Sequence, residues 1–183
     1  MKRLLYPAAY AESPYTLDYE RLYERGFRGI LFDIDNTLVP HGADTTPEAD
    51  ALLASVQRAG FKVLLLSDNG EARIARFMGN KALPYISNAG KPKPRSFRRA
   101  VKMLGLRKQE VLVIGDQLFT DILGANLAGL TGILVKYIGY YDAGDKGRRR
   151  ALEEKILARY AKSRAAEQLG NITREEAKDV ALR

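Results

Sequence analysis

Short apolar runs that alternate with amphipathic segments constrain the fold of this sequence more than any other feature. Each run has the length of a buried strand, and the segments between them repeat their apolar residues with the period of a helix. The predicted strands are residues 30–34, 61–66, 84–87, 110–114 and 131–135. The predicted helices are residues 47–59, 71–78, 94–104 and 119–127. Continuously apolar strands separated by helices imply an α/β fold, with one parallel sheet covered on both faces.

Two flanking regions complete the chain. Residues 1–27 are predicted to hold a short helix near residues 18–25, and residues 145–183 are predicted to be charged and helical. An apolar stripe in the second region consists of Leu152, Ile156, Leu157 and Tyr160. Residues 173–176 have the pattern of a capping box that opens a last helix. With a core at about residues 28–136, all 183 residues are expected to form a single domain.

Composition excludes several classes of protein and site. The chain is 46% hydrophobic and 28% charged, as in ordinary globular proteins. No stretch approaches the roughly 20 apolar residues of a membrane span, and the basic start lacks the apolar run of a secretory signal. We therefore expect a cytoplasmic protein. The absence of cysteine excludes thiolate metal sites and cysteine nucleophiles, and a single histidine, His41, excludes a histidine cluster.

The net charge of +8 comes from one segment. Eight of the 30 Lys and Arg lie in residues 91–108, which contain no Asp or Glu, and the remaining 22 equal the 22 acidic residues. Such a segment attracts phosphate, nucleic acid or an acidic membrane, unless it is only the solvated face of a helix. Arg95, Arg99 and Lys102 share one face of the predicted helix.

Polar residues follow the predicted strands, at the ends where open parallel sheets bind ligands. The first strand leads into Asp33-Ile34-Asp35-Asn36-Thr37, the second into Ser67-Asp68-Asn69-Gly70, and the fourth into Gly115-Asp116, with Asp121 five residues further on. Lys91 lies in the loop after the third strand. Two carboxylates two residues apart, Asp33 and Asp35, suggest a nucleophile paired with an acid/base, and half of a magnesium site.

This ordered set resembles the four motifs of the haloacid dehalogenase-like (HAD) phosphatase superfamily. The resemblance rests on Asp-x-Asp-x-Thr at 33–37, Ser67, Lys-Pro-x-Pro-x-x-Phe at 91–97 and Gly-Asp-x-x-x-x-Asp at 115–121. It implies a three-layer Rossmann-like fold with about five parallel strands. HAD enzymes often carry a cap domain between the first and second motifs or between the second and third. Both gaps are short here, about thirty residues or fewer, so no cap domain is expected.

The resemblance also implies catalytic and metal-binding roles. Asp33 would attack phosphorus and form an aspartyl-phosphate, while Asp35 would protonate the leaving group and then deprotonate the attacking water. Mg²⁺ would be held by the carboxylates of Asp33 and Asp116 and by the backbone carbonyl of Asp35. Asp121 would anchor Lys91 or a metal-bound water, with direct ligation as the alternative.

The same resemblance assigns the phosphate-binding residues. Ser67 and the groups near Asp68 and Asn69 would hold phosphate oxygens. Lys91 would bind the phosphoryl group as well and balance its negative charge. His41 lies just beyond the first motif, either over the site or facing solvent.

Further detail resembles the capless subfamily IIIA and, within it, the phosphatidylglycerophosphate phosphatase-like group. This rests on residues 33–39, 66–69, 91–100 and 115–121. It implies removal of a terminal phosphate from an anionic glycerophospholipid precursor, with peripheral contact between residues 91–108 and the inner face of an anionic membrane. A second group, Tyr137, Tyr140, Tyr141 and Arg148-Arg149-Arg150, would add interfacial contacts or else pack at the sheet edge.

Two other functions are compatible with these residues. The first is a phosphatase for nucleic-acid ends or nucleotides, which would use the basic segment to bind a polyanion, although no aromatic-rich platform for single strands accompanies it. The second is a non-catalytic scaffold that binds RNA or a protein. The presence of both Asp33 and Asp35 argues against the scaffold. The oligomeric state is left open by the sequence.

Overall fold

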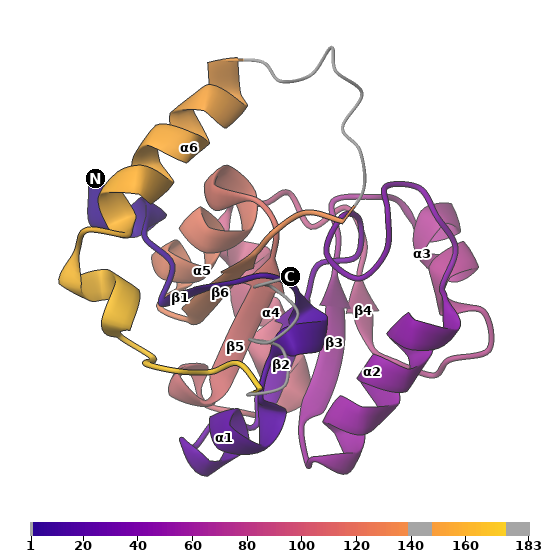
Figure 1. Ribbon diagram of the computed structural model, residues 1–183. Helices are drawn as coiled ribbons and strands as arrows, with labels where there is room; N and C mark the ends of the chain where they lie inside the picture. Colours follow the sequence, from indigo (N-terminus) through magenta and orange to yellow (C-terminus); the bar gives the residue numbers. More distant parts are fainter. Residues whose placement is uncertain (1, 139–147, 175–183) are drawn as a thin grey trace, which may run out of the picture.

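A parallel six-stranded sheet forms the centre of the computed structural model, which describes residues 2–138 and 148–174 (Figure 1). The strand order is β1-β6-β5-β2-β3-β4, and all neighbouring pairs are parallel. The strands are β1 (Ala9–Ala11), β2 (Gly29–Phe32), β3 (Lys62–Leu66), β4 (Tyr85–Ile86), β5 (Val111–Gly115) and β6 (Thr131–Val135). The predicted α/β fold is confirmed, and the sheet gains β1, an edge strand that pairs with β6.

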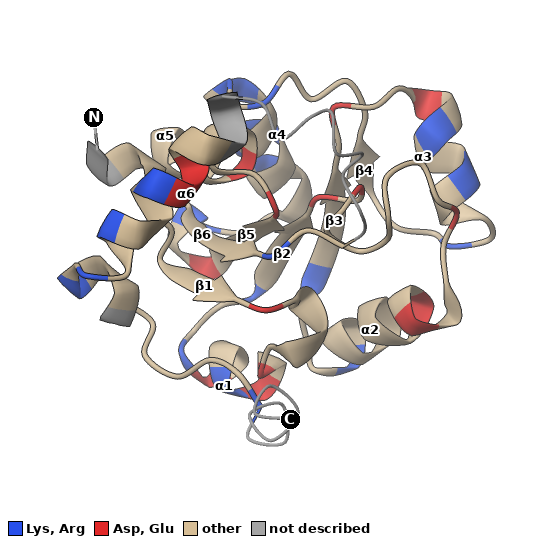
Figure 2. Cartoon of the chain, turned by 45° about the horizontal axis from the view of Figure 1, so that its top comes forward, with Lys and Arg blue, Asp and Glu red and all other residues tan. Residues whose placement is uncertain are grey.

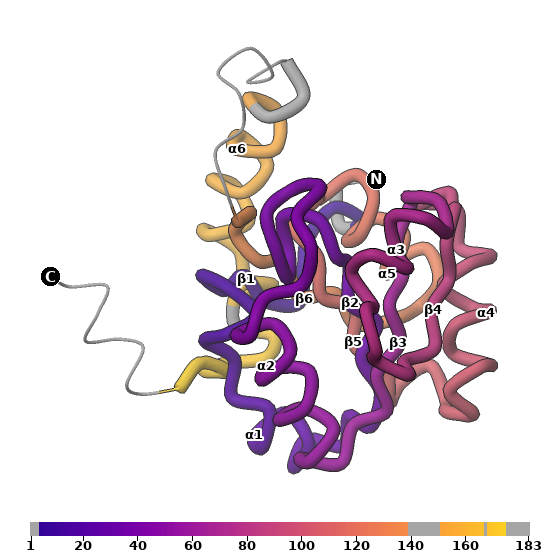
Figure 3. The backbone as a smooth tube through the Cα atoms, turned by 90° about the vertical axis from the view of Figure 1, so that its right-hand side faces the viewer, coloured from indigo at the N-terminus to yellow at the C-terminus, as the bar shows by residue number. Residues whose placement is uncertain are grey.

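Helices cover both faces of this sheet. They are α1 (Tyr19–Glu24), α2 (Pro47–Arg58), α3 (Glu71–Met78), α4 (Pro94–Leu104), α5 (Leu123–Ala128) and α6 (Arg148–Tyr160). Figure 3 shows α1 and α2 on one side of the strands and α4 on the other. The Thr46 hydroxyl accepts a hydrogen bond from the Ala49 backbone N–H, and Pro47 fills the first helical position, so α2 begins where its capping residues require.

Two apolar layers result from the alternation of side chains along the strands. In β2, Ile30 and Phe32 join the core beneath α1, α2 and α3, whereas Leu31 joins the core beneath α4 and α5. All three side chains are fully buried, which is worth about 1.5–3 kcal/mol each. α4 and α5 approach closely because Gly124 lies against the Phe97 ring, where a Cβ atom would collide.

Neither the segment between β2 and β3 nor the segment between β3 and β4 adds a cap domain over the site edge of the sheet. One helix, α2, lies between β2 and β3, and one helix, α3, lies between β3 and β4. Among the described helices, none combines the length and apolar composition needed to cross a bilayer.

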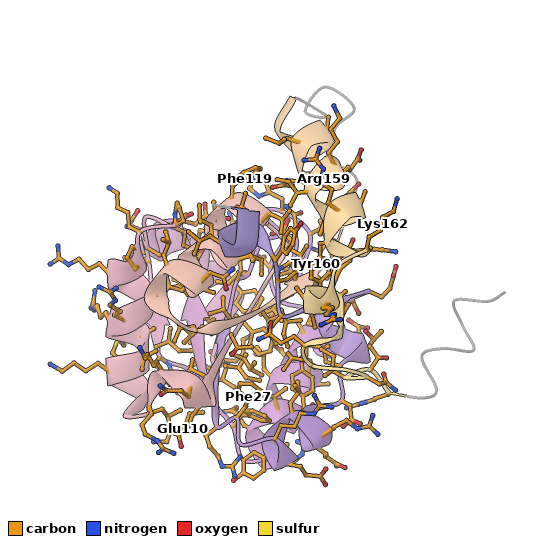
Figure 4. All side chains as sticks on the ribbon, turned by 90° about the vertical axis from the view of Figure 1, so that its left-hand side faces the viewer. Phe27, Glu110, Phe119, Arg159, Tyr160 and Lys162 are labelled. Carbon is orange, nitrogen blue, oxygen red and sulfur yellow. The ribbon has the colours of Figure 1, made fainter. Side chains whose placement is uncertain are left out.

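α6 packs against the body through part of its predicted apolar stripe. Ile156 and Leu157 contact a small core at the helical turn η4 (Leu118–Ile122) and at β6, and Tyr160 is buried against the ring of Tyr6. Figure 4 shows Tyr160 near the body of the protein and Lys162 pointing away from it. Leu152 is 49% exposed, because the first turns of α6 project beyond the sheet (Figure 1).

Residues 169–174 run back beside the N-terminal region. The Asp18 backbone N–H donates to the Ile172 carbonyl over 2.8 Å, and the Arg174 N–H donates to the Thr16 carbonyl over 3.0 Å. Leu17 and Thr173 form an isolated antiparallel bridge. The predicted capping box begins at this bridge, but Glu175 and Glu176 lie outside the described residues, as do Tyr140 and Tyr141.

Candidate active site

Three central strands place three predicted site residues side by side. Asp33, Ser67 and Asp116 directly follow β2, β3 and β5, which are neighbours in the order β5-β2-β3. Figure 2 shows acidic segments on the loops around the labels of these strands. The Asp33 N–H still donates to the Ile114 carbonyl of β5 over 2.9 Å, so the sheet itself fixes the start of this loop.

Lys91 joins two carboxylates from different loops. Its Nζ atom lies 2.6 Å from Asp33 Oδ1 and 2.6 Å from Asp121 Oδ1. The side chains of Lys91 and Asp121 are only 4% and 2% exposed. Buried ion pairs of this kind hold the groups in one arrangement, because separating them would leave a charge without compensation.

The environment shifts the protonation of both partners. Burial raises the pKa of Asp33 to about 7; Lys91 opposes this shift, and Asp121 and Asp35 add to it. Burial also disfavours the charge on Lys91, but the Asp121 and Asp33 carboxylates more than offset this and hold the pKa of Lys91 above its ordinary value. Lys91 is therefore a cation at neutral pH.

Asp116 completes a set of three carboxylates. One oxygen each from Asp33, Asp116 and Asp121 lies within 4.8 Å of the others. With one lysine among three carboxylates, the cluster is short of positive charge when the carboxylates ionise. All the donors are hard oxygens, which Mg²⁺ prefers, so the residues fit a magnesium ion.

The backbone around Asp121 fixes the position of its carboxylate. It lies in η4 (Leu118–Ile122), a π-helical turn, and its Oδ2 accepts a hydrogen bond from the Gln117 N–H over 3.2 Å. Gly115 leaves room for this carboxylate, since a Cβ atom at Gly115 would collide with it. With Oδ1 on Lys91 and Oδ2 on Gln117, Asp121 is arranged as an anchor for Lys91.

A tight turn follows Asp33. Asn36 has a positive φ of 62°, and its N–H donates to the Val39 carbonyl over 2.7 Å. The fully buried Thr37 donates its hydroxyl to Asp33 Oδ2 over 3.3 Å. The two Asp33 oxygens are thus held by Lys91 on one side and Thr37 on the other.

The loop after β3 is tied to the rest of the site through its side chains. Ser67 is buried, and its hydroxyl oxygen accepts the Asn69 N–H over 3.2 Å. Asp68 accepts the backbone N–H of Lys91 over 2.8 Å, and Asn69 donates its side-chain amide to Asp35 Oδ2 over 2.7 Å. These contacts position neighbouring loops, and phosphate binding by the three residues stays a prediction.

The Asp35 carboxylate points to a set of donors distinct from the Lys91 cluster. Its Oδ1 accepts the Gly42 N–H over 2.6 Å and the Arg73 guanidinium over 2.9 Å from Nη2 and 3.3 Å from Nε. His41 lies 3.9 Å from the same oxygen, but its side chain is 76% exposed. The sequence alone did not identify Arg73 as a site residue. The one signal that could have done so is its position in the first turn of the helix after the second motif.

Two cavities differ in their relation to the site. One of 390 Å³ borders Asp116 and is lined by Tyr10, Leu134, Tyr137 and Leu157, among others. A larger hollow of 770 Å³ lies beside α1 and α2 and touches none of the predicted site residues. Only the smaller of these two cavities therefore adjoins the carboxylate cluster, at Asp116.

Comparison with known proteins identifies the family of this chain. The HAD-hydrolase-like family model matches residues 88–160. The Bacillus subtilis protein named probable phosphatase YqeG is 35% identical over 159 residues, which cover 86% of this chain and 92% of that protein.

The chain is also similar, at lower identity, to another phosphatase and to a solved hydrolase structure. The Arabidopsis thaliana phosphatidylglycerophosphate phosphatase 1 is 25% identical over 133 residues, which cover 66% of this chain but only 37% of that protein. A structure titled as an HAD superfamily (subfamily III A) hydrolase from Legionella pneumophila covers 82% of this chain and 91% of its own, with 19% identity and a TM-score of 0.50. The last of these similarities concerns the fold alone.

Proposed function

Because the chain belongs to the HAD-like hydrolase superfamily and is a phosphoric monoester hydrolase, we propose that it is a magnesium-dependent phosphatase that works through an aspartyl-phosphate on Asp33. The observation that supports this most is the buried contact of Lys91 with both Asp33 and Asp121. We also propose that all 183 residues act as one phosphatase domain.

The chemistry divides between Asp33 and Asp35. An Asp33 oxygen attacks phosphorus while the bond from phosphorus to the leaving oxygen breaks, and Asp35 gives that oxygen a proton. Asp35 then takes a proton from water as the water oxygen attacks phosphorus, and the bond to Asp33 breaks. Lys91 balances the charge that builds on the phosphoryl oxygens. Ser67, Asp68 and Asn69 complete the phosphate-binding side through their loop.

Asp33 and Asp116 are the residues that we propose hold Mg²⁺, together with the backbone carbonyl of Asp35. When bound, the ion supplies positive charge to the phosphoryl oxygens and favours the ionised form of the nucleophile. Asp121 holds Lys91 beside the nucleophile Asp33. The shortage of positive charge among the three clustered carboxylates supports this assignment.

We propose that the substrate is a phosphate on an anionic lipid, such as phosphatidylglycerophosphate. The two segments that could carry a cap each hold a single helix, so a bulky substrate can approach the site edge. On α4, Arg95, Arg98, Arg99 and Lys102 are exposed, and no ion pair engages them within the described chain. Each cation near an anionic bilayer contributes about 1 kcal/mol, which favours peripheral membrane contact.

Removal of magnesium tests the metal assignment. Chelation is expected to abolish hydrolysis of an aryl phosphate, and added Mg²⁺ to restore it. At about 100 times its dissociation constant, Mg²⁺ should raise the free energy of unfolding by about 2.7 kcal/mol, measured by chemical denaturation. Asp116→Asn should lose this stabilisation. Asp44→Asn, which changes a 71% exposed carboxylate, should keep it; equal stabilisation of both variants would contradict the assignment.

A substrate panel tests the lipid proposal. Turnover of phosphatidylglycerophosphate in mixed micelles should exceed that of a 3′-phosphorylated oligonucleotide and of phosphoserine. Replacing Arg95, Arg99 and Lys102 by serine should weaken micelle activity by about 10²-fold while sparing a soluble aryl phosphate. The charge-matched control replaces Lys155, Arg159 and Lys162 on and after α6. Preference for the oligonucleotide would favour the nucleic-acid alternative, and tight RNA binding without any turnover would favour the scaffold.

A further inference from the structure

Arg73 is the cation that contacts Asp35. It lies in the first turn of α3, and its side chain is 12% exposed. Two of its nitrogens, Nη2 and Nε, converge on the single oxygen Oδ1 of Asp35. Its third nitrogen, Nη1, is buried and has no hydrogen-bond partner in the part of the chain that the structure describes. A buried donor without an acceptor costs about 1–3 kcal/mol of stability. The position of Arg73 therefore carries a free-energy cost.

The donors around Asp35 distinguish its two oxygens. Oδ1 accepts three N–H groups, from Gly42 and from two nitrogens of the charged Arg73. Oδ2 accepts only the neutral side-chain amide of Asn69 among the hydrogen bonds of the described residues. Hydrogen bonds from a charged donor are roughly twice as strong as neutral ones. The charged contacts therefore fix Oδ1, and Oδ2 is the oxygen more readily released.

We propose that Arg73 is a positioning residue: by holding Asp35 through Oδ1, it leaves Oδ2 as the oxygen that exchanges a proton with the leaving group and with water. This rests on the proposed function, since it assigns Asp35 to proton transfer. Arg73 itself touches no reacting atom. Its effect is to keep the Asp35 side chain in one rotamer, which spares the entropy of ordering it at each turnover.

If Arg73 positions Asp35, the loss of rate on removing Arg73 should depend on the pKa of the leaving group. When the phenol has a low pKa, its phenolate leaves without a proton. When the phenol has a higher pKa, the leaving oxygen needs a proton from Asp35. If Arg73 positions Asp35, its removal should slow the first chemical step little for 4-nitrophenyl phosphate and about 10–100-fold for phenyl phosphate. A purely structural contribution would slow all substrates by the same factor.

The experiment is rapid-mixing measurement of phenol release in the first turnover, with full-length protein, Mg²⁺ and a series of substituted phenyl phosphates. The logarithm of the rate should fall with leaving-group pKa more steeply in Arg73→Ala than in the wild type. Arg73→Lys, which can still donate to Oδ1, should give an intermediate slope. Arg58→Ala is the matched control, because Arg58 is an exposed arginine at the end of α2 that contacts neither Asp35 nor Gly42 among the described residues; its slope should equal that of the wild type.

The outcomes separate this proposal from the proposed function. Turnover by the wild type, with equal slopes in wild type, Arg73→Ala and Arg73→Lys, would overturn the role of Arg73 and leave the phosphatase intact. Absence of turnover by folded wild-type protein would overturn both. If Arg73→Ala does not fold, as judged by circular dichroism, the slopes of Arg73→Lys and Arg73→Gln decide in the same way.

Discussion

Asp33→Asn is expected to lower turnover by at least about 10⁴-fold while the protein remains folded. An amide has the shape of the carboxylate but cannot attack phosphorus to form an acyl phosphate, and it is a weaker magnesium ligand. The substitution also removes one of two carboxylates from Lys91, which keeps its contact with Asp121. Steady-state hydrolysis of 4-nitrophenyl phosphate measures the loss, and thermal unfolding monitored by circular dichroism verifies the fold.

Trapping the intermediate sharpens this prediction. Wild-type protein mixed with a ³²P-labelled substrate and quenched in acid should carry label, and Asp33→Asn should carry none. Asp44→Asn is a suitable comparison, because its carboxylate is 71% exposed and pairs with Arg76 rather than with Lys91 or Asp33; it should still become labelled. Turnover of Asp33→Asn within tenfold of the wild type would exclude Asp33 as the nucleophile.

Lys91→Met is expected to lower both stability and activity. The substitution keeps the apolar stem but leaves Asp33 and Asp121 buried without their shared cation. Removing one partner of a buried ion pair costs about 3–5 kcal/mol, and the loss of charge next to the phosphoryl group should cost at least about 10²-fold in turnover. Urea denaturation in the presence of a chelator measures the first effect, and aryl phosphate hydrolysis the second.

The stability loss in Lys91→Met should depend on pH. Without Lys91, which lowers the pKa of Asp33, that pKa rises further above its unfolded value, so the folded state binds more protons than the unfolded state. The free energy of unfolding should then fall as pH rises from about 4 to 8, more steeply than in the wild type. Lys102→Met, on the exposed face of α4, should change stability by less than about 0.5 kcal/mol. Equal stability of Lys91→Met and wild type would contradict the burial of an uncompensated charge.

Local signals predicted much of the fold. The bounds of α3 and α4 agree with the predicted 71–78 and 94–104, because Gly70 and Pro94 mark their starts and Gly79 and Gly105 their ends. Residues 119–127 were predicted as one helix but begin as the π-helical turn η4 before α5. That turn holds Asp121 against Lys91, a contact between residues 30 positions apart that local propensity does not encode.

Two other features depend on distant partners. β1 has only three residues, two of them alanine, and its strand conformation comes from pairing with β6, more than 100 positions later in the chain. Arg73 has no motif around it, and its partner Asp35 lies 38 positions earlier. The ordered motif residues could be predicted from the sequence, because each follows a strand, whereas the residue that orients one of them required the tertiary structure.

The strip of chain at residues 169–174 sets an order of events during protein synthesis. Leu169 and Ile172 complete the apolar core that contains Leu17 and Leu22, and Arg21 meets Asn171 across 150 positions of sequence. At about 5–20 residues per second, a ribosome needs roughly 8–30 seconds to make the intervening chain. During that interval the side of α1 that this strip later covers is open to solvent and available to chaperones, and the strands that carry the carboxylates are made before the strip.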